Sequence, residues 1–220
     1  MMENKKKPLM IVIGVVAAVL VGVGLVMLAR GSEYPLTVLD PVLGNANAPI
    51  VIEEFADFQC PACRLAAVAV EEVVKMYPTQ VKVVYKDFPI PGHEFARFVA
   101  AAGLCSAQQN KFAEFYKETF DKQTAWAAMD QQGVDTMLTT WAGEQKIDVA
   151  AFNECRASRT VKSQIEADYQ AGVKRTVNST PTFFIDGEKQ EGGLTVFQWI
   201  QKIDAALSKK GLASENVIKQ

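Results

Sequence analysis

Apolar residues follow three different spacings along the chain, and each spacing predicts a different kind of element. From Pro8 to Ala29 no residue is charged, and a helix of this length covers about 30 Å, the thickness of a bilayer core. Residues 49–55 form an apolar run rich in β-branched residues, and residues 80–88 alternate in polarity, so both predict strands. Residues 60–76 between them have apolar positions at helical spacing. This order of strand, helix and strand predicts a parallel βαβ unit.

The pattern changes after residue 94, where helical spacing replaces the strand signals until about residue 173. Helices are predicted over residues 94–108, 111–120, 130–145, 149–158 and 161–171. Strand signals return at residues 182–185 and 188–191, and a last amphipathic helix is predicted over residues 196–207. The pattern therefore predicts an α/β fold with an inserted helical subdomain at about residues 92–173.

Taken together, these patterns predict five segments. They are a cytoplasmic basic segment (1–7), a transmembrane anchor (8–29), a linker (30–46), the α/β domain with its helical insertion (47–210) and a polar tail (211–220). The linker is inferred from its prolines and turn-forming residues.

The N-terminal apolar run predicts where the rest of the chain lies. Lys5, Lys6 and Lys7 precede the run, which predicts a single-pass cell-membrane protein with a cytoplasmic N-terminus and an extracytoplasmic domain. The alternative is a cleaved signal peptide, whose apolar core is usually about 7–15 residues long. The longer run and the poor cleavage site around Ala29 favour the anchor. Either interpretation places the cysteines outside the cytoplasm.

Composition narrows the classes of function. The 220 residues are 49% hydrophobic, which suffices for one compact domain with appendages, and the net charge of −2 comes with no basic patch for nucleic acid. The four cysteines form an even number, which is compatible with an oxidising compartment.

The segment Cys60-Pro61-Ala62-Cys63 lies between a predicted strand and a predicted helix. A thiol at a helix N-terminus is stabilised as the thiolate, and Pro61 suits the first helical position. A structural zinc site usually needs four ligands, and the chain has one histidine, His93. A c-type haem site needs histidine where Arg64 stands. A redox-active pair is therefore favoured over a metal site or a structural disulfide.

Three segments in order resemble the DsbA-like branch of the thioredoxin-fold thiol:disulfide oxidoreductases. They are Glu54-Phe-Ala-Asp-Phe-Gln-Cys-Pro-Ala-Cys63, Lys86-Asp-Phe-Pro89 and Ser179-Thr-Pro-Thr-Phe-Phe184. The resemblance covers residues 43–207 and implies a thioredoxin-like fold with a helical insertion. It also implies an exported enzyme without a cofactor that introduces disulfides into unfolded or reduced exported proteins. A membrane partner of the DsbB or vitamin K epoxide reductase type would reoxidise it.

The resemblance also implies roles for individual residues. Cys60 would be the exposed sulfur of low pKa, and Cys63 its partner. Thr180 and Pro181, the latter at the family's cis-proline position, would hold the substrate backbone and keep metals from the thiols. Glu54 would be a buried acid beneath the active site, although it could also face solvent on an exposed strand surface.

The chain departs from the best-known member of the family at Ala62, where that member has histidine. Histidine there stabilises the thiolate, so alanine predicts a less oxidising couple. Cys105 and Cys155 lie on predicted helices of the insertion, and some relatives carry a disulfide there; the alternative is two buried thiols.

Several interpretations remain open from the sequence. His93 is expected at a surface helix start. The aromatic residues of the insertion predict its core, or the border of an apolar groove; they are Phe95, Phe98, Phe112, Phe115 and Tyr116. A disulfide isomerase or reductase, and a membrane-tethered binding module without enzymatic activity, are the alternative functions.

Overall fold

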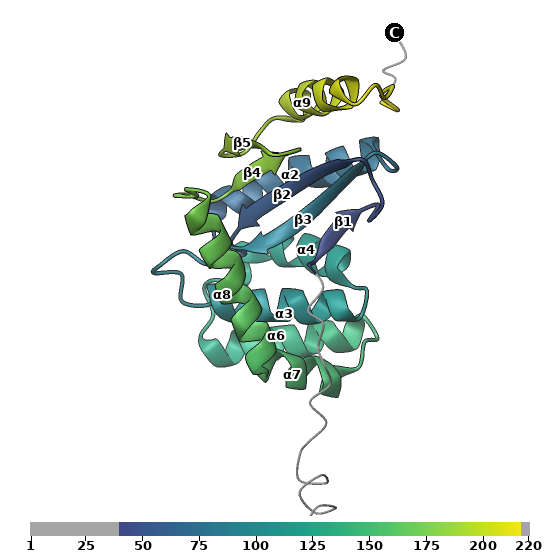
Figure 1. The fold of residues 1–220 in the computed structure, drawn as a ribbon. Helices are drawn as coiled ribbons and strands as arrows, with labels where there is room; N and C mark the ends of the chain where they lie inside the picture. Colours follow the sequence, from purple (N-terminus) through teal and green to yellow (C-terminus); the bar gives the residue numbers. More distant parts are fainter. Residues whose placement is uncertain (1–39, 217–220) are drawn as a thin grey trace, which may run out of the picture. The chain divides into compact units, whose positions relative to one another are not determined.

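The computed structural model describes residues 40–216 (Figure 1). The predicted basic segment, transmembrane anchor and most of the linker lie outside the described residues, as do the last four residues of the predicted tail. Within the described part of the chain, no helix is both long enough and apolar enough to cross a membrane.

The centre of the fold is a five-stranded mixed sheet with the strand order β1-β3-β2-β4-β5. Its strands are β1 (Val42–Gly44), β2 (Ile50–Ala56), β3 (Val81–Asp87), β4 (Thr182–Ile185) and β5 (Glu188–Glu191). β2 and β3 are parallel, and the other neighbouring pairs are antiparallel. The predicted βαβ unit is thereby confirmed, since α2 (Pro61–Met76) connects the two parallel strands.

Six helices lie between β3 and β4 and form the insertion. They are α3 (Ala96–Gln108), α4 (Phe112–Asp121), α5 (Gln123–Trp126), α6 (Gln131–Glu144), α7 (Val149–Ala157) and α8 (Arg159–Lys174), and α9 (Val196–Lys209) follows the sheet. These bounds confirm the predicted helical insertion. The thioredoxin-like α/β fold with inserted helices is therefore present in the described residues.

The two faces of the sheet bury different helices. Ile52 and Ala56 of β2 belong to the main core with α2, whereas Phe55 of the same strand packs with Phe88 and Phe184. On that second face α8 crosses the sheet (Figure 1), and its Tyr169 stacks on Phe88 with 4.8 Å between ring centroids. Alternation along the strand therefore puts Glu54 on the face that carries α2.

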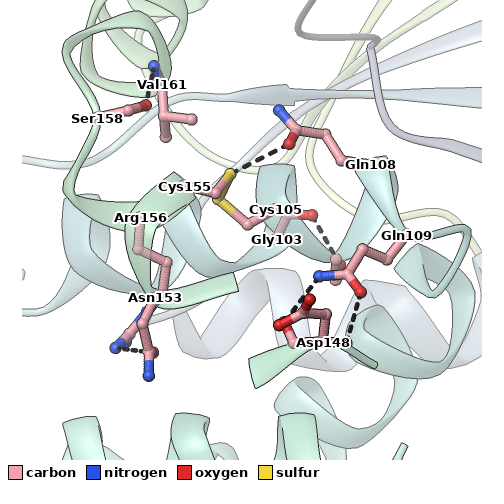
Figure 2. Close-up of a disulfide and its surroundings, with 11 residues drawn as sticks. Gly103, Cys105, Gln108, Gln109, Asp148, Asn153, Cys155, Arg156, Ser158 and Val161 are labelled. Atoms are coloured by element: carbon pink, nitrogen blue, oxygen red, sulfur yellow. Dashed lines mark hydrogen bonds between the residues drawn. A yellow bond between two sulfur atoms is a disulfide. The ribbon is translucent and has the colours of Figure 1, made fainter. Parts of the chain in front are cut away.

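A disulfide between Cys105 of α3 and Cys155 of α7 joins two helices of the insertion (Figure 2). The Cα atoms are 5.8 Å apart, and the bond closes a loop across a sequence separation of 50. The predicted disulfide is confirmed. Most of the aromatic residues named above are buried in the core, among them Phe112, Phe115 and Tyr116.

The structure corrects the predicted linker at its C-terminal end. Val42–Gly44 form β1, which pairs antiparallel with residues 82–84 of β3. The strand has three residues, too few to show an alternating pattern, and its partner lies far along the chain. The helix α5, with four residues, is also absent from the sequence prediction for the same reason of length.

Candidate active site

The dithiol lies at the turn from β2 into α2. Cys60 is the N-cap residue of α2, and Pro61 occupies its first turn. The backbone N–H of Cys60 donates to the carbonyl of Asp57 at 3.0 Å, which closes the turn. No side chain caps the helix, so its first free N–H groups remain available to a negative charge at Cys60.

The two cysteines differ in exposure and in acidity. Both are free thiols and both are buried, Cys60 at 8% exposure and Cys63 at 0%, so the expectation of an exposed Cys60 is corrected to a small accessible fraction. The pKa of Cys60 is lowered to about 5, mainly by a hydrogen bond from the Cys63 thiol. Burial opposes this effect, whereas the Thr180 hydroxyl and the N–H groups of Cys63 and Ala62 lower the pKa further. Burial, followed by the neighbouring Cys60, raises the pKa of Cys63 well above its usual value. At neutral pH, Cys60 is therefore the thiolate and Cys63 the thiol.

The loop before β4 lies against the dithiol. The peptide bond between Thr180 and Pro181 is cis, and the Cys60 sulfur is 3.6 Å from the Thr180 carbonyl oxygen. The Thr180 hydroxyl is buried and has no hydrogen-bond partner among residues 40–216. It is placed to donate to either sulfur when that sulfur is ionised. The structure thus brings the Cys60–Cys63 segment and the Thr180–Pro181 segment together, as the family resemblance implies, although Cys60 and Thr180 are 120 residues apart.

Glu54 is a fully buried side chain. Burial raises the pKa of its carboxyl to about 8, against the opposing effect of a hydrogen bond from Tyr116. The interpretation of Glu54 as a solvent-facing residue is therefore wrong, since its side chain points into the main core. Its neighbour Glu53 points to the opposite face and binds Arg175 at 2.7 Å.

Gln123 of α5 lies at the site although the sequence does not predict it there. Its side-chain amide donates to the carbonyl of Phe58 at 2.7 Å and to the carbonyl of Cys60 at 2.9 Å. The inserted helices therefore hold the turn that carries the dithiol. No pattern around residue 123 signals this role, because both contacts span more than 60 residues of sequence.

Asp57 links the same turn to the loop after β3. Its buried carboxylate accepts from the N–H of Gln59 at 2.8 Å and of Ile90 at 2.9 Å. The ring nitrogen Nδ1 of His93 lies 2.7 Å from Oδ2 of this carboxylate, the oxygen that also accepts from Ile90. His93 stands just before α3 with 27% of its side chain exposed, near the expected surface helix start, and its ring in addition contacts the buried Asp57.

Metal-ligating side chains do not gather at the dithiol. Across residues 40–216, no three or more His, Cys, Asp and Glu side chains lie together in a way that could hold a metal ion. The geometry instead pairs one reactive sulfur with one buried sulfur, next to the Thr180 carbonyl. This arrangement is suited to forming and breaking a disulfide.

Comparison with known proteins agrees with this chemistry. A family model described as Thioredoxin matches residues 37–205. The probable disulfide bond formation protein D of Bacillus cereus is 28% identical over 201 residues, covering 85% of this chain and 91% of that protein. The crystal structure of alpha-DsbA1 from Wolbachia pipientis has the same fold, with a TM-score of 0.67 at 22% identity over 77% of this chain and 92% of that one.

The domain also occurs as part of longer proteins. The Na⁺/H⁺ antiporter NhaA 3 of Salinispora tropica is 32% identical over 154 residues. These residues are 70% of this chain and 22% of the antiporter. The chain therefore spans about a quarter or less of the length of the antiporters that it matches.

Proposed function

We propose, from the premise that this chain belongs to the thioredoxin family, that it introduces disulfides into exported proteins. It is a thiol:disulfide oxidoreductase of the DsbA type, with Cys60 and Cys63 as the exchanging pair. The observation that carries the proposed direction is the unequal acidity of the two sulfurs. A pKa of about 5 at Cys60 stabilises the reduced enzyme, and a stable reduced form makes the disulfide form an oxidant.

The exchange takes place in two steps. A substrate thiolate attacks the Cys60 sulfur of the oxidised enzyme; the bond between the enzyme sulfurs breaks, and Cys63 leaves with the electron pair and takes up a proton. A second substrate thiolate then attacks the substrate sulfur of the mixed disulfide, and Cys60 leaves as a thiolate. The substrate is oxidised by two electrons and the enzyme dithiol is reduced.

Thr180 and Pro181 would hold the substrate during these steps. The Thr180 carbonyl, 3.6 Å from the Cys60 sulfur, lies where an extended substrate backbone reaches the mixed disulfide. The Thr180 hydroxyl would stabilise the Cys60 thiolate as it leaves. Glu54 would exchange a proton with Cys63. No cofactor is required for this cycle.

The proposed place of action is the outer side of the cell membrane, with a cytoplasmic N-terminus. The uncharged run from Pro8 to Ala29 after the lysines at 5–7 supports an anchor, and the similarity to part of a Na⁺/H⁺ antiporter is compatible with it. A membrane protein of the DsbB or vitamin K epoxide reductase type would reoxidise the dithiol. Cell fractionation and N-terminal sequencing test the anchor, and a mature protein that starts near residue 30 would exclude it.

The reduction potential of the Cys60–Cys63 pair tests the proposed direction. The pKa of about 5 at Cys60 lies between about 7 for thioredoxin and about 3.5 for DsbA. We therefore expect a potential between about −270 and −120 mV, as the alanine at position 62 also predicts. A glutathione redox titration measures it; a value as high as that of the strongest oxidants contradicts the role given to Ala62, and one at the thioredoxin limit favours a reductase.

An activity assay separates the remaining functions. The oxidised enzyme should oxidise a reduced peptide faster than it refolds a scrambled substrate, and Cys60→Ser should abolish both activities. The pair Cys105→Ala and Cys155→Ala, which leaves the dithiol intact, serves as the matched control. Faster refolding of the scrambled substrate identifies an isomerase, and activity that survives Cys60→Ser points to a binding module.

A further inference from the structure

A buried hydrogen bond connects the sheet to the inserted helices near the dithiol. The phenol hydroxyl of Tyr116 donates to the carboxyl of Glu54 and lies 3.2 Å from each of its two oxygens. Glu54 belongs to β2 and Tyr116 to α4, 62 residues further along the chain. Neither side chain is exposed to solvent. Among residues 40–216, this hydroxyl is the only hydrogen-bond donor to the Glu54 carboxyl.

We propose that Tyr116 is a positioning residue for disulfide exchange: its hydroxyl fixes the Glu54 carboxyl that supplies and recovers the proton of Cys63. The proposal rests on the proposed function and deepens it. It assigns to the inserted helices a part in the chemistry, because α4 carries the group that holds the acid.

The proton balance explains why the carboxyl needs a donor. When a substrate thiolate breaks the enzyme disulfide, Cys63 becomes a thiolate in a fully buried site. A proton from the Glu54 carboxyl converts it into a thiol and leaves a buried carboxylate, and reoxidation of the dithiol returns the proton. A buried carboxylate without a donor is strongly destabilised, and a hydroxyl that donates to it offsets part of that cost.

The titratable groups that act on the Tyr116 hydroxyl or lie opposite Glu54 come from β3 and α2, beside α4 itself. Tyr85 lies opposite Glu54 in the register of β3, Cys63 and Glu71 belong to α2, and Tyr116 belongs to α4. Burial, and then the neighbouring Glu54, raises the pKa of Tyr116, and the charges of Cys63 and Glu71 add to this effect. The thiol and the carboxyl therefore both act on the Tyr116 hydroxyl, which remains protonated and available as a donor.

Tyr85 provides a matched control within the same core. It is as buried as Tyr116, and the two rings pack with their centroids 6.0 Å apart. Its hydroxyl, however, has no hydrogen-bond partner in the described part of the chain. Replacing either tyrosine by phenylalanine removes one buried hydroxyl, but only the change at Tyr116 removes a hydrogen bond to Glu54.

The first experiment follows the Glu54 carboxyl carbon by NMR as a function of pH in the reduced full chain. Its Glu54→Gln variant identifies the signal. Tyr116→Phe should lower the acid dissociation constant of Glu54 by about tenfold or more, because the ionised form loses its donor. Tyr85→Phe should change it by less than about twofold. An unchanged constant in Tyr116→Phe, or equal changes in both variants, would overturn the proposal.

The second experiment connects the contact to the reaction. The rate at which reduced peptide is oxidised is measured against pH in the wild type, Tyr116→Phe, Glu54→Gln and the double variant. Tyr116→Phe should shift the pH profile, and the shift should disappear in the Glu54→Gln background. A shift of equal size in that background would show that Tyr116 acts on folding or on another group. If the wild type oxidises no peptide, the proposed function fails, while the NMR titration still decides whether Tyr116 holds Glu54.

Discussion

Glu54 makes the stability of the fold depend on pH. Its carboxyl has a pKa of about 8 in the folded chain, whereas the ordinary value is 4.5. A raised pKa means that the folded state binds the proton more tightly than the unfolded state. The stabilisation that the folded state gains from protonated Glu54 is complete below pH 4.5 and is lost as the pH rises through 8. The free energy of unfolding therefore falls over this range, by up to about 5 kcal/mol from this one group.

Glu54→Gln should remove this part of the dependence. Glutamine fills the same space and carries no titrating proton, so the variant should be more stable than the wild type above pH 8. The slope of unfolding free energy against pH, measured by urea denaturation of the reduced proteins between pH 5 and 8, should decrease by about one proton. A remaining slope is expected because burial also raises the pKa values of Asp87 and Asp168.

Glu53→Gln is the control for this measurement. Glu53 is the next residue on β2, lies on the other face and binds Arg175 at 2.7 Å with 30% of its side chain exposed. Loss of such a partly exposed ion pair costs about 1 kcal/mol or less. The variant keeps the Glu54 carboxyl, so the part of the slope that this carboxyl causes should persist. An unaltered slope in Glu54→Gln would contradict the buried carboxyl.

At the scale of residues, the sequence predicts the site residues that belong to a local motif. It does not predict the residues that reach the site only through a long-range hydrogen bond. Cys60, Cys63, Thr180 and Pro181 could be named because their neighbours in the chain carry a family resemblance. For Tyr116 the sequence predicts a place in the core of the insertion or at the border of an apolar groove, and no role beside Glu54. Its hydroxyl reaches Glu54 across 62 residues, and no local spacing encodes which of several buried tyrosines makes such a contact.

The short helix α5 holds the active-site turn through one side chain. The Gln123 amide donates to the carbonyls of Phe58 and Cys60, and the Cys60 carbonyl also accepts the first helical N–H, from Arg64 at 3.2 Å. Gln123→Met keeps the length of the side chain and removes both donated bonds. It should lower the free energy of unfolding by about 1–3 kcal/mol, because buried carbonyl groups lose a partner.

The same variant should loosen the start of α2 in particular. Hydrogen exchange of the amides of Ala62, Cys63 and Arg64 should become faster than in the wild type, while amides of β2 keep their protection. Gln131→Met, a change at an exposed position at the start of α6, should alter neither quantity. Unchanged exchange at these three amides in Gln123→Met would show that the turn is stable without the two hydrogen bonds from Gln123.

At the scale of elements, length decided what the sequence could predict. Long helices such as α2 and α9 show several turns of regular spacing, and their ends carry Pro61 or the capping box formed by Thr195 and Gln198. β1 and α5 are too short for any period to be visible. Both form because of long-range contacts, with β3 and with the active-site turn, so their existence depends on the assembled fold.

The disulfide acts on the molecule as a whole. It links α3 to α7. The insertion that it closes carries Tyr116, which donates to Glu54, and Gln123, which donates to the carbonyls of Phe58 and Cys60. In the chain-entropy model, a loop across a separation of 50 residues corresponds to about 4 kcal/mol of stability. The disulfide therefore stabilises the helices that hold the active-site turn, while Cys60 and Cys63 are free thiols in this structure.

The double variant Cys105→Ala and Cys155→Ala tests this connection. Alanine suits these buried positions because it leaves no polar atom unpaired. Urea denaturation should show that the free energy of unfolding falls by about 2–4 kcal/mol. Amide hydrogen exchange should accelerate more in α3 and α7 than in β2 and β3. The Cys60–Cys63 potential should stay within about 30 mV of the wild type, since both sulfurs and their donors remain.

A larger change of the potential would mean that the insertion sets the redox balance directly, through the Gln123 and Tyr116 contacts. Measuring exchange and potential on the same variant separates the two cases. If the helices loosen while the potential holds, the disulfide stabilises the insertion, and the dithiol depends on contacts that survive this loosening. If both change together, the contacts that Tyr116 and Gln123 make from α4 and α5 depend on the disulfide that closes the insertion. Reduction of Cys105 and Cys155 would then also change the potential of the Cys60–Cys63 pair.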